Sequence, residues 1–341
     1  MFINYLKRVV EGGELTSSEA YDVINLLVTE EVPENQAAAF FAALRLRKET
    51  GEELYGFASA LLEKAIKDDG LEGLLDTCGT GGDGCRTFNI STAAAIVCAA
   101  CGVQVAKHGN RAVTSRAGSA DVLESLGVRV NLDLEEARAV LEEVGIVFLF
   151  APGFHPVMKK FGSMRRSLGI ATAFNFLGPL VNPFFPSFQV LGVSDPAMLE
   201  PVAQALFKLG RKRALVVHAE NGMDEISHVG TTRMARVDGH GITLDTFEPA
   251  QLGFRGDSLE GIQGGDAADN ARIIKEVLAG NPGPARDVVL LNAAAALVVA
   301  EKAGDMADGL RLAAEAIDSG RATAKLGELV RLTQGSRVKE C

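Results

Sequence analysis

The sequence contains no tryptophan, few other aromatic residues and no long hydrophobic run. Aromatic residues make up 6 % of the 341 positions, so small and aliphatic residues must supply most of the core. The longest apolar run, 288–300, is interrupted by Asn292 and is shorter than the ~20 residues that a membrane-spanning helix requires. The first 20 residues lack the long apolar stretch of a signal peptide. These absences predict a cytoplasmic protein without a membrane partner.

Basic residues are also in deficit, because the net charge is −10. Nucleic acids need a basic surface, so the charge argues against them as partners, although a local basic pocket could still bind a small anion. The five cysteines are an odd number, and a chain of this length can bury a core without disulfides. Cys98 and Cys101 form a C-x-x-C pair inside an alanine- and valine-rich run. We interpret them as small core residues rather than as a redox or metal motif.

The length predicts roughly two domains, and the sequence pattern changes near residue 70. Residues 1–70 show helical periodicity and two capping boxes, Thr16–Glu19 and Thr50–Glu53. From residue 71 to 341, short β-like runs alternate with helical runs, which predicts a mostly parallel sheet covered by helices. The candidate strands are 73–77, 103–107, 128–132, 146–150, 188–193, 213–218 and 233–238.

Three unusual loops follow candidate strands: 78–92, 107–119 and 151–166. In a parallel sheet the carboxyl ends of the strands lie along one edge, where ligands bind, so we expect these loops to form the functional site. The segment 170–187 is rich in proline and phenylalanine and fits neither period well. We interpret the region near 165–187 as a crossover that completes the helical domain.

The stretch Asp76–Gly84, DTCGTGGDG, satisfies the dinucleotide-binding pattern G-x-G-x-x-G. The nicotinamide interpretation fails because the next candidate strand ends in the basic segment KHGNR rather than in an acidic residue. Cys85 stands where a P-loop needs lysine. A backbone-amide cradle for phosphate remains, and the helix that opens at Asn89 would support it. The alternative is a purely structural turn.

Three further elements each allow two interpretations. The loop 107–120 combines Lys107, Arg111 and Arg116 with hydroxyl side chains, which suits a diphosphate or simply a solvated loop. Asp224 and Glu225 could bind Mg²⁺ together with substrate phosphates, or could be ordinary surface acids. Arg165–Arg166 could hold a carboxylate or form a surface ion pair. Together the motifs predict a magnesium-bound polyphosphate and a second, anionic ligand, which they do not name.

Five motifs in order resemble anthranilate phosphoribosyltransferases: GTGGD, NIST, KHGNRAVTSRAGSADVLE, HPVMKKFGSMRRSLG with FNFLGPLVNP, and GMDEIS. The resemblance extends along nearly the whole chain. It implies a small all-helical N-terminal domain (1–70) and a larger α/β domain (71–341) whose mostly parallel central sheet is flanked by helices. It also implies a homodimer formed through the helical domain, two Mg²⁺ ions per subunit, and transfer of phosphoribosyl from phosphoribosyl diphosphate to anthranilate. Association with an anthranilate synthase subunit is left open.

The resemblance also implies roles for individual residues. Lys107 would stabilise the transition state, and no covalent nucleophile is expected. Ser91, Asp224 and Glu225 would bind the metal. Anthranilate would contact Gly79, His108, Asn110, His155, Arg165 and Pro179. Phosphoribosyl diphosphate would contact Gly79, Gly82, Asp83, Thr87, Asn89, Ile90, Ser91, Thr92, Lys107, His108, Gly109, Asn110, Arg111, Ala112, Val113, Thr114, Ser115 and Ser119.

Two alternatives share features of this chain. A pyrimidine nucleoside phosphorylase would have a similar fold and a G-S-x-D-x-L-E stretch, here Gly118–Glu124, but the KHGN motif and the acidic pair favour the transferase. A non-catalytic, nucleic-acid-binding relative should be basic and should have lost the anthranilate motifs. This chain is acidic and retains them.

Overall fold

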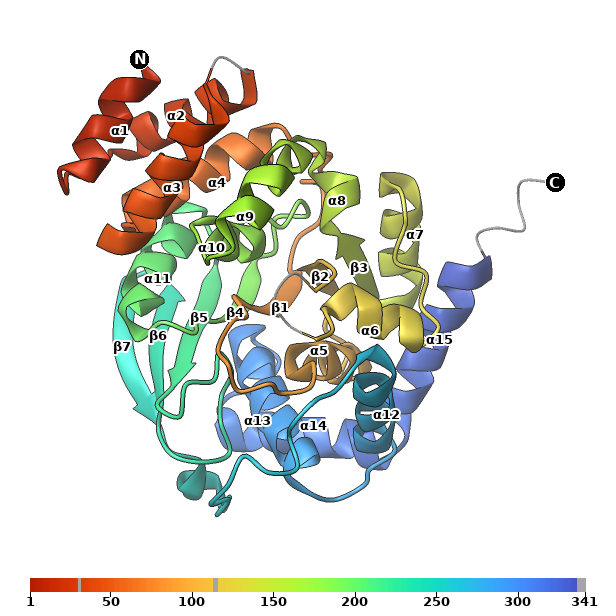
Figure 1. Cartoon of the computed structure of the whole chain (residues 1–341). Coiled ribbons are helices and arrows are strands. Elements are labelled where there is room, and N and C mark those ends of the chain that lie inside the picture. The colour runs from red at the N-terminus through yellow and green to blue at the C-terminus, as the bar shows by residue number, and fades with distance from the viewer. Residues whose placement is uncertain (30–31, 113–115, 336–341) are drawn as a thin grey trace.

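The computed structural model describes residues 1–29, 32–112 and 116–335. A bundle of helices from the N-terminal part lies against one face of an α/β unit (Figure 1). The bundle is formed by α1 (Phe2–Val10), α2 (Ser17–Thr29), α3 (Glu34–Arg47) and α4 (Gly51–Glu63). Both predicted capping boxes are confirmed. Thr50 accepts from the Glu53 N–H at the start of α4, and Thr16 and Glu19 bond reciprocally before α2.

The described residues contain one seven-stranded sheet in the order β3-β2-β1-β4-β5-β6-β7. The first five strands in this order pair in parallel, and β6 and β7 are antiparallel. The predicted mostly parallel sheet is therefore confirmed. The strands are β1 (Leu75–Gly79), β2 (Val105–Gly109), β3 (Ile146–Phe150), β4 (Phe188–Gly192), β5 (Arg213–Ala219), β6 (Thr232–Asp238) and β7 (Gly241–Phe247).

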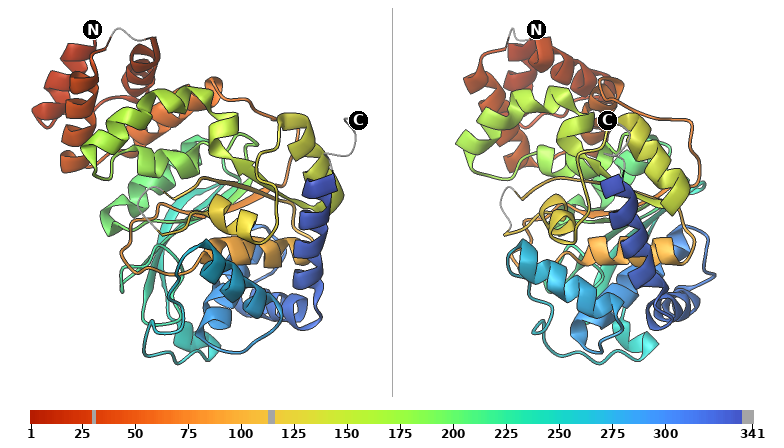
Figure 2. Two further views of the ribbon diagram at one scale, coloured as in Figure 1. Left: turned by 45° about the vertical axis from the view of Figure 1, so that its right-hand side comes forward. Right: turned by 90° about the vertical axis from the view of Figure 1, so that its right-hand side faces the viewer.

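Helices cover both faces of the sheet (Figure 2). The bundle and α9–α11 lie on one face, whereas α5 and α12–α15 lie on the other. The remaining helices are α5 (Ile90–Ala100), α6 (Ser119–Ser125), α7 (Leu134–Val144), α8 (Ala151–Phe154), α9 (Gly162–Leu168), α10 (Phe174–Leu180), α11 (Leu199–Lys208), α12 (Ala267–Leu278), α13 (Pro284–Val299), α14 (Met306–Asp318) and α15 (Arg321–Gly335), with 3₁₀ turns at Pro156–Phe161, Pro196–Met198 and Pro249–Leu252.

The sheet separates two hydrophobic cores. On β5, Leu215 and Val217 join the core beneath α5 and α13, whereas Ala214 and Val216 join the core beneath the bundle. Successive side chains of a strand point to opposite faces, so one strand serves both cores. Cys98 and Cys101 are buried in the first core as free thiols, which confirms the structural interpretation of the C-x-x-C pair. No helix among the described residues has the length and apolar character to cross a bilayer.

The crossover region contains α9 and α10, and its aromatic residues pack against the bundle. The ring of Phe174 lies 4.7 Å from that of Phe41 on α3 and 4.8 Å from that of Phe161. The predicted domain boundaries at 70 and 71 fall in the segment between α4 and β1.

One predicted strand was wrong, and one strand was not predicted. Residues 128–132 are not a strand: Val128 and Val130 are buried, but the Arg129 N–H donates to the Thr333 hydroxyl rather than to a neighbouring strand. Their alternating pattern reflects packing against α15. β7 was not predicted, because it is an edge strand with four consecutive exposed residues and little hydrophobic signal.

Lys48 ends α3 in a backbone conformation that favours glycine, with φ of +74° and ψ of 143°. A side chain there is strained. The ammonium lies 2.5 Å from an Asp195 carboxylate oxygen, but this ion pair is partly exposed and contributes little to stability.

We therefore expect Lys48→Gly to be more stable than Lys48→Ala by about 1–2 kcal/mol, because both variants lose the ion pair and only glycine relieves the strain. Urea unfolding of the two variants measures the difference. Equal stabilities would show that Lys48 is not strained.

Candidate active site

The glycine loop that follows β1 is folded against the acidic pair that follows β5. The Gly81 N–H donates to Asp224 Oδ2 over 2.7 Å. A Cβ on Gly79 would lie 2.5 Å from that oxygen, and one on Gly192 would lie 1.5 Å from the Asp224 carbonyl oxygen. Gly79 is therefore required for close packing against Asp224, whereas Gly81 and Gly82 adopt positive φ. Because β1, β2 and β3 pair in parallel, the predicted loops after these strands begin at the same edge of the sheet.

Three carboxylates crowd this region. Asp83 contributes a buried Oδ2 with no hydrogen-bond partner among the described residues. Burial, and then the charge of Asp83, raises the pKa of Asp224 to about 7. Burial, and then the charge of Asp224, raises the pKa of Glu225 well above its ordinary value. If all three acids were ionised, their negative charge would exceed what their surroundings compensate.

Lys107 is the buried cation nearest to these acids. It is 4 % exposed at the end of β2, and its ammonium donates to the Thr77 carbonyl of β1 and, over 3.2 Å, to Ser91 Oγ of α5. Its charge lowers the pKa of Glu225 against the effect of burial. Glu225 Oε1 also accepts from the Ser91 N–H over 3.2 Å. Ser91 and Glu225, two of the three predicted metal ligands, are thus in direct contact.

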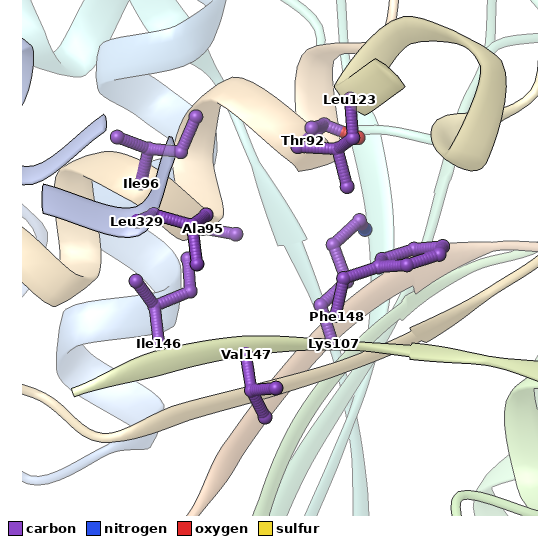
Figure 3. A pocket seen from close by; sticks show the side chains of 9 residues that line it. All are labelled: Thr92, Ala95, Ile96, Lys107, Leu123, Ile146, Val147, Phe148 and Leu329. Carbon is purple, nitrogen blue, oxygen red and sulfur yellow. The ribbon is translucent and has the colours of Figure 1, made fainter. Parts of the chain in front are cut away.

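A small cavity lies beneath this cluster, between α5 and the sheet (Figure 3). The stem of Lys107 lines it together with Ile96, Phe148 and Leu123. The hydroxyl of Thr92 is buried nearby without a partner among the described residues. At about 10 Å³ the cavity has room for at most one water molecule, so it is a packing defect and not a substrate pocket.

The N-terminus of α5 is held by α12 and by the segment that precedes α12. Asn270 donates to Asn89 Oδ1 over 2.9 Å, and Asn89 Nδ2 in turn faces the Ala117 carbonyl at 3.4 Å. Thr87 forms an isolated antiparallel bridge with Gln263. Ile90 is the first residue of α5. Asn89 therefore connects the two loops that were predicted to bind phosphate.

The second predicted phosphate loop is organised by Asp121, which accepts from the N–H groups of Ala112 and Gly118 over 2.9 Å. Arg111 pairs with Asp121 and Glu124 on α6, at 3.2 and 2.7 Å. The Arg111 guanidinium therefore forms ion pairs with carboxylates of this chain. The sequence did not indicate these pairs. Asn110 and Ser119 are joined at 3.4 Å, and Gly109 lies against Ser119. Val113, Thr114 and Ser115 lie outside the described residues.

A less polar region lies on the other face of the sheet, next to α10. The rings of His108 and His155 pack edge to face, with centroids 5.2 Å apart and an interplanar angle of 61°. His108 Nδ1 lies 3.0 Å from the Gly178 carbonyl, and His155 Nε2 lies 2.7 Å from the Val181 carbonyl. Burial lowers the pKa of His108 to about 3 and that of His155 to about 4. Both rings are therefore neutral at pH 7.

Because a carbonyl oxygen only accepts, the proton of each neutral ring must lie on the nitrogen that faces it. His108 Nε2 and His155 Nδ1 are then acceptors, and neither has a partner among the described residues. Buried acceptors without a partner indicate that a ligand binds here and donates a hydrogen bond to them.

Arg165 lies on α9 at the border of this region. Its guanidinium lies 5.3 Å from the ring centroid of Phe174, and no carboxylate of the described residues pairs with it. Burial lowers the pKa of Arg165. A partly desolvated guanidinium without an anionic partner is suited to bind a carboxylate.

Comparisons with known proteins agree with this arrangement. Residues 71–323 match the α/β domain of a glycosyl transferase family, and residues 3–65 match the helical bundle domain of that family. An anthranilate phosphoribosyltransferase from Syntrophomonas wolfei is 56 % identical over 342 residues. The alignment covers 100 % of this chain and 100 % of that protein.

Two solved structures are similar over almost their whole length. An anthranilate phosphoribosyltransferase from Thermus thermophilus has a TM-score of 0.90 at 42 % identity, covering 97 % of this chain and 99 % of that one. The enzyme from Saccharomyces cerevisiae, in complex with PRPP and Mg, has a TM-score of 0.88 at 28 % identity, covering 98 % of each chain. The chain belongs to the anthranilate phosphoribosyltransferase family. The resemblance seen in the sequence is confirmed, and the protein is a pentosyltransferase.

Within this member of the anthranilate phosphoribosyltransferase family, sequence reasoning overlooked several residues that hold the site. Asn292 was noted only as an interruption of an apolar run, yet it donates to and accepts from the backbone of Ile226, next to the acidic pair. A polar residue inside a buried helix was the available signal. Asn270 lies far along the sequence from every motif, although it contacts Asn89 in the fold, and no local sequence pattern distinguishes it.

The histidine tautomers can be tested by NMR. We expect long-range ¹⁵N–¹H spectra to show His108 with its proton on Nδ1 and His155 with its proton on Nε2, because carbonyls fix both. Neither ring should titrate between pH 5.5 and 8. The chain has five histidines, and His108→Asn and His155→Asn variants assign the two signals. Protonation of either ring near pH 6.5 would contradict the arrangement.

Proposed function

We propose that this chain transfers the 5-phosphoribosyl group from phosphoribosyl diphosphate to the amine of anthranilate, giving N-(5-phosphoribosyl)anthranilate and diphosphate in tryptophan biosynthesis. One observation carries the proposal: Lys107 and His108 are consecutive on β2 and serve two chemically different regions. Lys107 donates to the carbonyl of Thr77 on β1 and to Ser91 of α5, and it acts on Glu225 through its charge. His108, in contrast, contacts the less polar region beside α10. A charged donor and an aromatic acceptor need two such regions side by side.

The diphosphate would bind among the glycine loop, the start of α5 and the loop after β2. Backbone N–H groups of Gly82 and its neighbours, the N-terminus of α5 and the Lys107 ammonium supply positive potential there. Anthranilate would bind beside α10, with its carboxylate on Arg165 and its ring near His108, His155 and Pro179. Gly79 is the last residue of β1 and Asn110 directly follows β2. Both would contact anthranilate where it meets the phosphoribosyl group.

The chemistry of the acidic cluster fits a divalent cation. Asp224 is buried, its chain neighbour Glu225 is half-buried, and the charge of Asp83 helps to raise the pKa of Asp224. The Oδ2 of Asp83 has no hydrogen-bond partner among the described residues. No group of three or more His, Cys, Asp or Glu side chains in the described part of the chain forms a metal site by itself. This suits Mg²⁺, which uses one or two carboxylates and completes its coordination with phosphate oxygens and water. When bound with the diphosphate, Mg²⁺ would offset the negative charge of the leaving group. We propose that each subunit binds two Mg²⁺ ions.

The residues around the acceptor account for the chemistry without a strong base. The anthranilate amine is of the aniline type and is neutral at pH 7, so it needs orientation rather than deprotonation before attack. His108 Nε2 can accept a hydrogen bond from this amine, because its lone pair is free and its ring is neutral. Lys107 and the loop amides stabilise charge that develops on the departing diphosphate.

A fluorescence assay of anthranilate consumption tests the function. Consumption should require phosphoribosyl diphosphate and Mg²⁺ together, and EDTA should abolish it. Thymidine with inorganic phosphate should give no cleavage, and single-stranded DNA should give no salt-dependent gel shift. Activity only toward thymidine, or DNA binding without turnover, would support one of the two alternatives instead.

Arg165→Ala should raise the KM for anthranilate by about ten- to a hundredfold, because a charge-assisted hydrogen bond to a carboxylate contributes about 1.5–3 kcal/mol. The KM for phosphoribosyl diphosphate should stay unchanged. Arg165→Lys is the matched control, and it should recover part of the loss because it keeps the charge but not the bidentate geometry. An unchanged KM for anthranilate in Arg165→Ala would remove Arg165 from the site.

We further propose a cytoplasmic homodimer formed through the helical bundle. Ile3 and Val10 on α1 are 41 % and 64 % exposed, and Leu46 on α3 is 88 % exposed. The two helices pack together through Phe2 and Phe40, whose rings lie 5.5 Å apart. Exposed apolar side chains on adjoining helices indicate a surface that a second subunit would cover.

Leu46→Glu combined with Val10→Glu should therefore convert the dimer to a monomer in size-exclusion chromatography with light scattering. Leu244→Glu is the control, because Leu244 is 55 % exposed on β7, outside the bundle. A dimer that survives the double substitution, or dissociates in the control, would place the interface elsewhere.

A further inference from the structure

The carbonyl groups at the C-terminal end of α10 have unusual partners. The last carbonyls of a helix lack partners within the helix and must find them elsewhere. Here three buried side chains supply them. His108 donates to Gly178 over 3.0 Å, Gln189 to Pro179 over 2.7 Å, and His155 to Val181 over 2.7 Å. Two of these donors are the histidines beside the proposed anthranilate region, and the third, Gln189, belongs to none of the sequence motifs.

Gln189 lies on β4 and is completely buried. An amide side chain can turn over and exchange its donor and acceptor, so its orientation depends on its partners. Arg211 Nε donates to Gln189 Oε1 over 2.9 Å. A guanidinium has donors and no acceptor, so it fixes the oxygen of Gln189 toward itself and the NH₂ group toward the Pro179 carbonyl.

Burial of the Arg211 guanidinium lowers the stability of the fold. Arg211 is 4 % exposed, and burial lowers its pKa to about 10. Its Nη2 is buried without a hydrogen-bond partner among the described residues. An apolar side chain at this place would avoid the desolvation of a charge. Packing of the interior alone would therefore favour an apolar residue at position 211 and does not explain the arginine.

A buried carboxylate completes the network on the other side. Asp76 on β1 is completely buried and accepts from Asn182 Nδ2 over 2.9 Å and from the His108 N–H over 3.4 Å. Its charge raises the pKa of Arg211 against the effect of burial. The network thus reaches both the backbone of His108 and the segment after α10.

We propose that Arg211 and Gln189 are positioning residues for the aromatic acceptor. By fixing the Pro179 carbonyl, they hold the Gly178 carbonyl where it accepts a hydrogen bond from His108 Nδ1–H, and so keep the Nε2 lone pair of His108 free for the acceptor amine. Neither residue touches a substrate in this account. The inference rests on the proposed function, because it assigns the region beside α10 to anthranilate.

Gln189→Glu is the decisive variant. A carboxylate there pairs well with Arg211, but it has no donor for Pro179 and repels that carbonyl. A purely structural role predicts an intact fold and an unchanged KM for anthranilate. The positioning role predicts an intact fold, a KM for anthranilate raised about fivefold or more, and a KM for phosphoribosyl diphosphate within about twofold of the wild type.

Arg211→Met and Arg211→Lys form a matched pair. Methionine removes the donor that orients Gln189, so the KM for anthranilate should rise. Lysine keeps a donor, so Arg211→Lys should recover much of the effect. The inference is overturned if folded Gln189→Glu binds anthranilate like the wild type, or if Arg211→Lys is as impaired as Arg211→Met.

The ¹⁵N spectrum of His108 gives a readout that does not depend on turnover. In Gln189→Glu we expect the Nδ1–H form to lose population, with the change confined to His108. An unchanged His108 spectrum would also overturn the inference. Wild-type protein that is inactive toward anthranilate would refute the proposed function instead, and the spectra would still show whether Gln189 positions His108.

Discussion

The buried ammonium of Lys107 is the constraint on which the site depends. An ammonium group removed from water needs hydrogen-bond acceptors and negative charge around it. It finds them in the Thr77 carbonyl of β1, the Ser91 hydroxyl of α5 and the charge of Glu225. These partners come from three separate parts of the chain. The cation therefore links β1, the start of α5 and the acidic pair, while the acidic groups around it remain in excess.

The alternation of a β-strand then divides the site into two halves. Lys107 and His108 are neighbours on β2, so their side chains point to opposite faces of the sheet. One face holds α5 and the crowded carboxylates, and the other holds α10 and two neutral imidazoles. A shift of β2 by one residue relative to β3 would exchange the two side chains and destroy both halves. The register of one central strand thus sets a charged region beside a weakly polar one.

The sequence predicted the parts of this arrangement that depend on local pattern. Loops after parallel strands must meet at one edge, so the proximity of Gly79 and Asp224 could be anticipated. Contacts between distant segments could not. Arg111 looks like a free cation in the sequence but pairs with Glu124, and the Gln189–Arg211 pair joins residues that no motif connects. The prediction of a strand at 128–132 was wrong because alternating apolar residues indicate only that one side of the segment is buried. The buried side can pack against another strand or, as here, against α15.

The central claim is that the excess acids and Lys107 together form a site for a magnesium-bound diphosphate. Isothermal titration calorimetry of inorganic diphosphate into the wild-type protein tests it most directly. The account predicts saturable binding in the presence of Mg²⁺ and weaker binding in Lys107→Met. It predicts loss of binding in EDTA, because no cation then links the acidic cluster to the anion. Equal affinity with Mg²⁺ and with EDTA would contradict it.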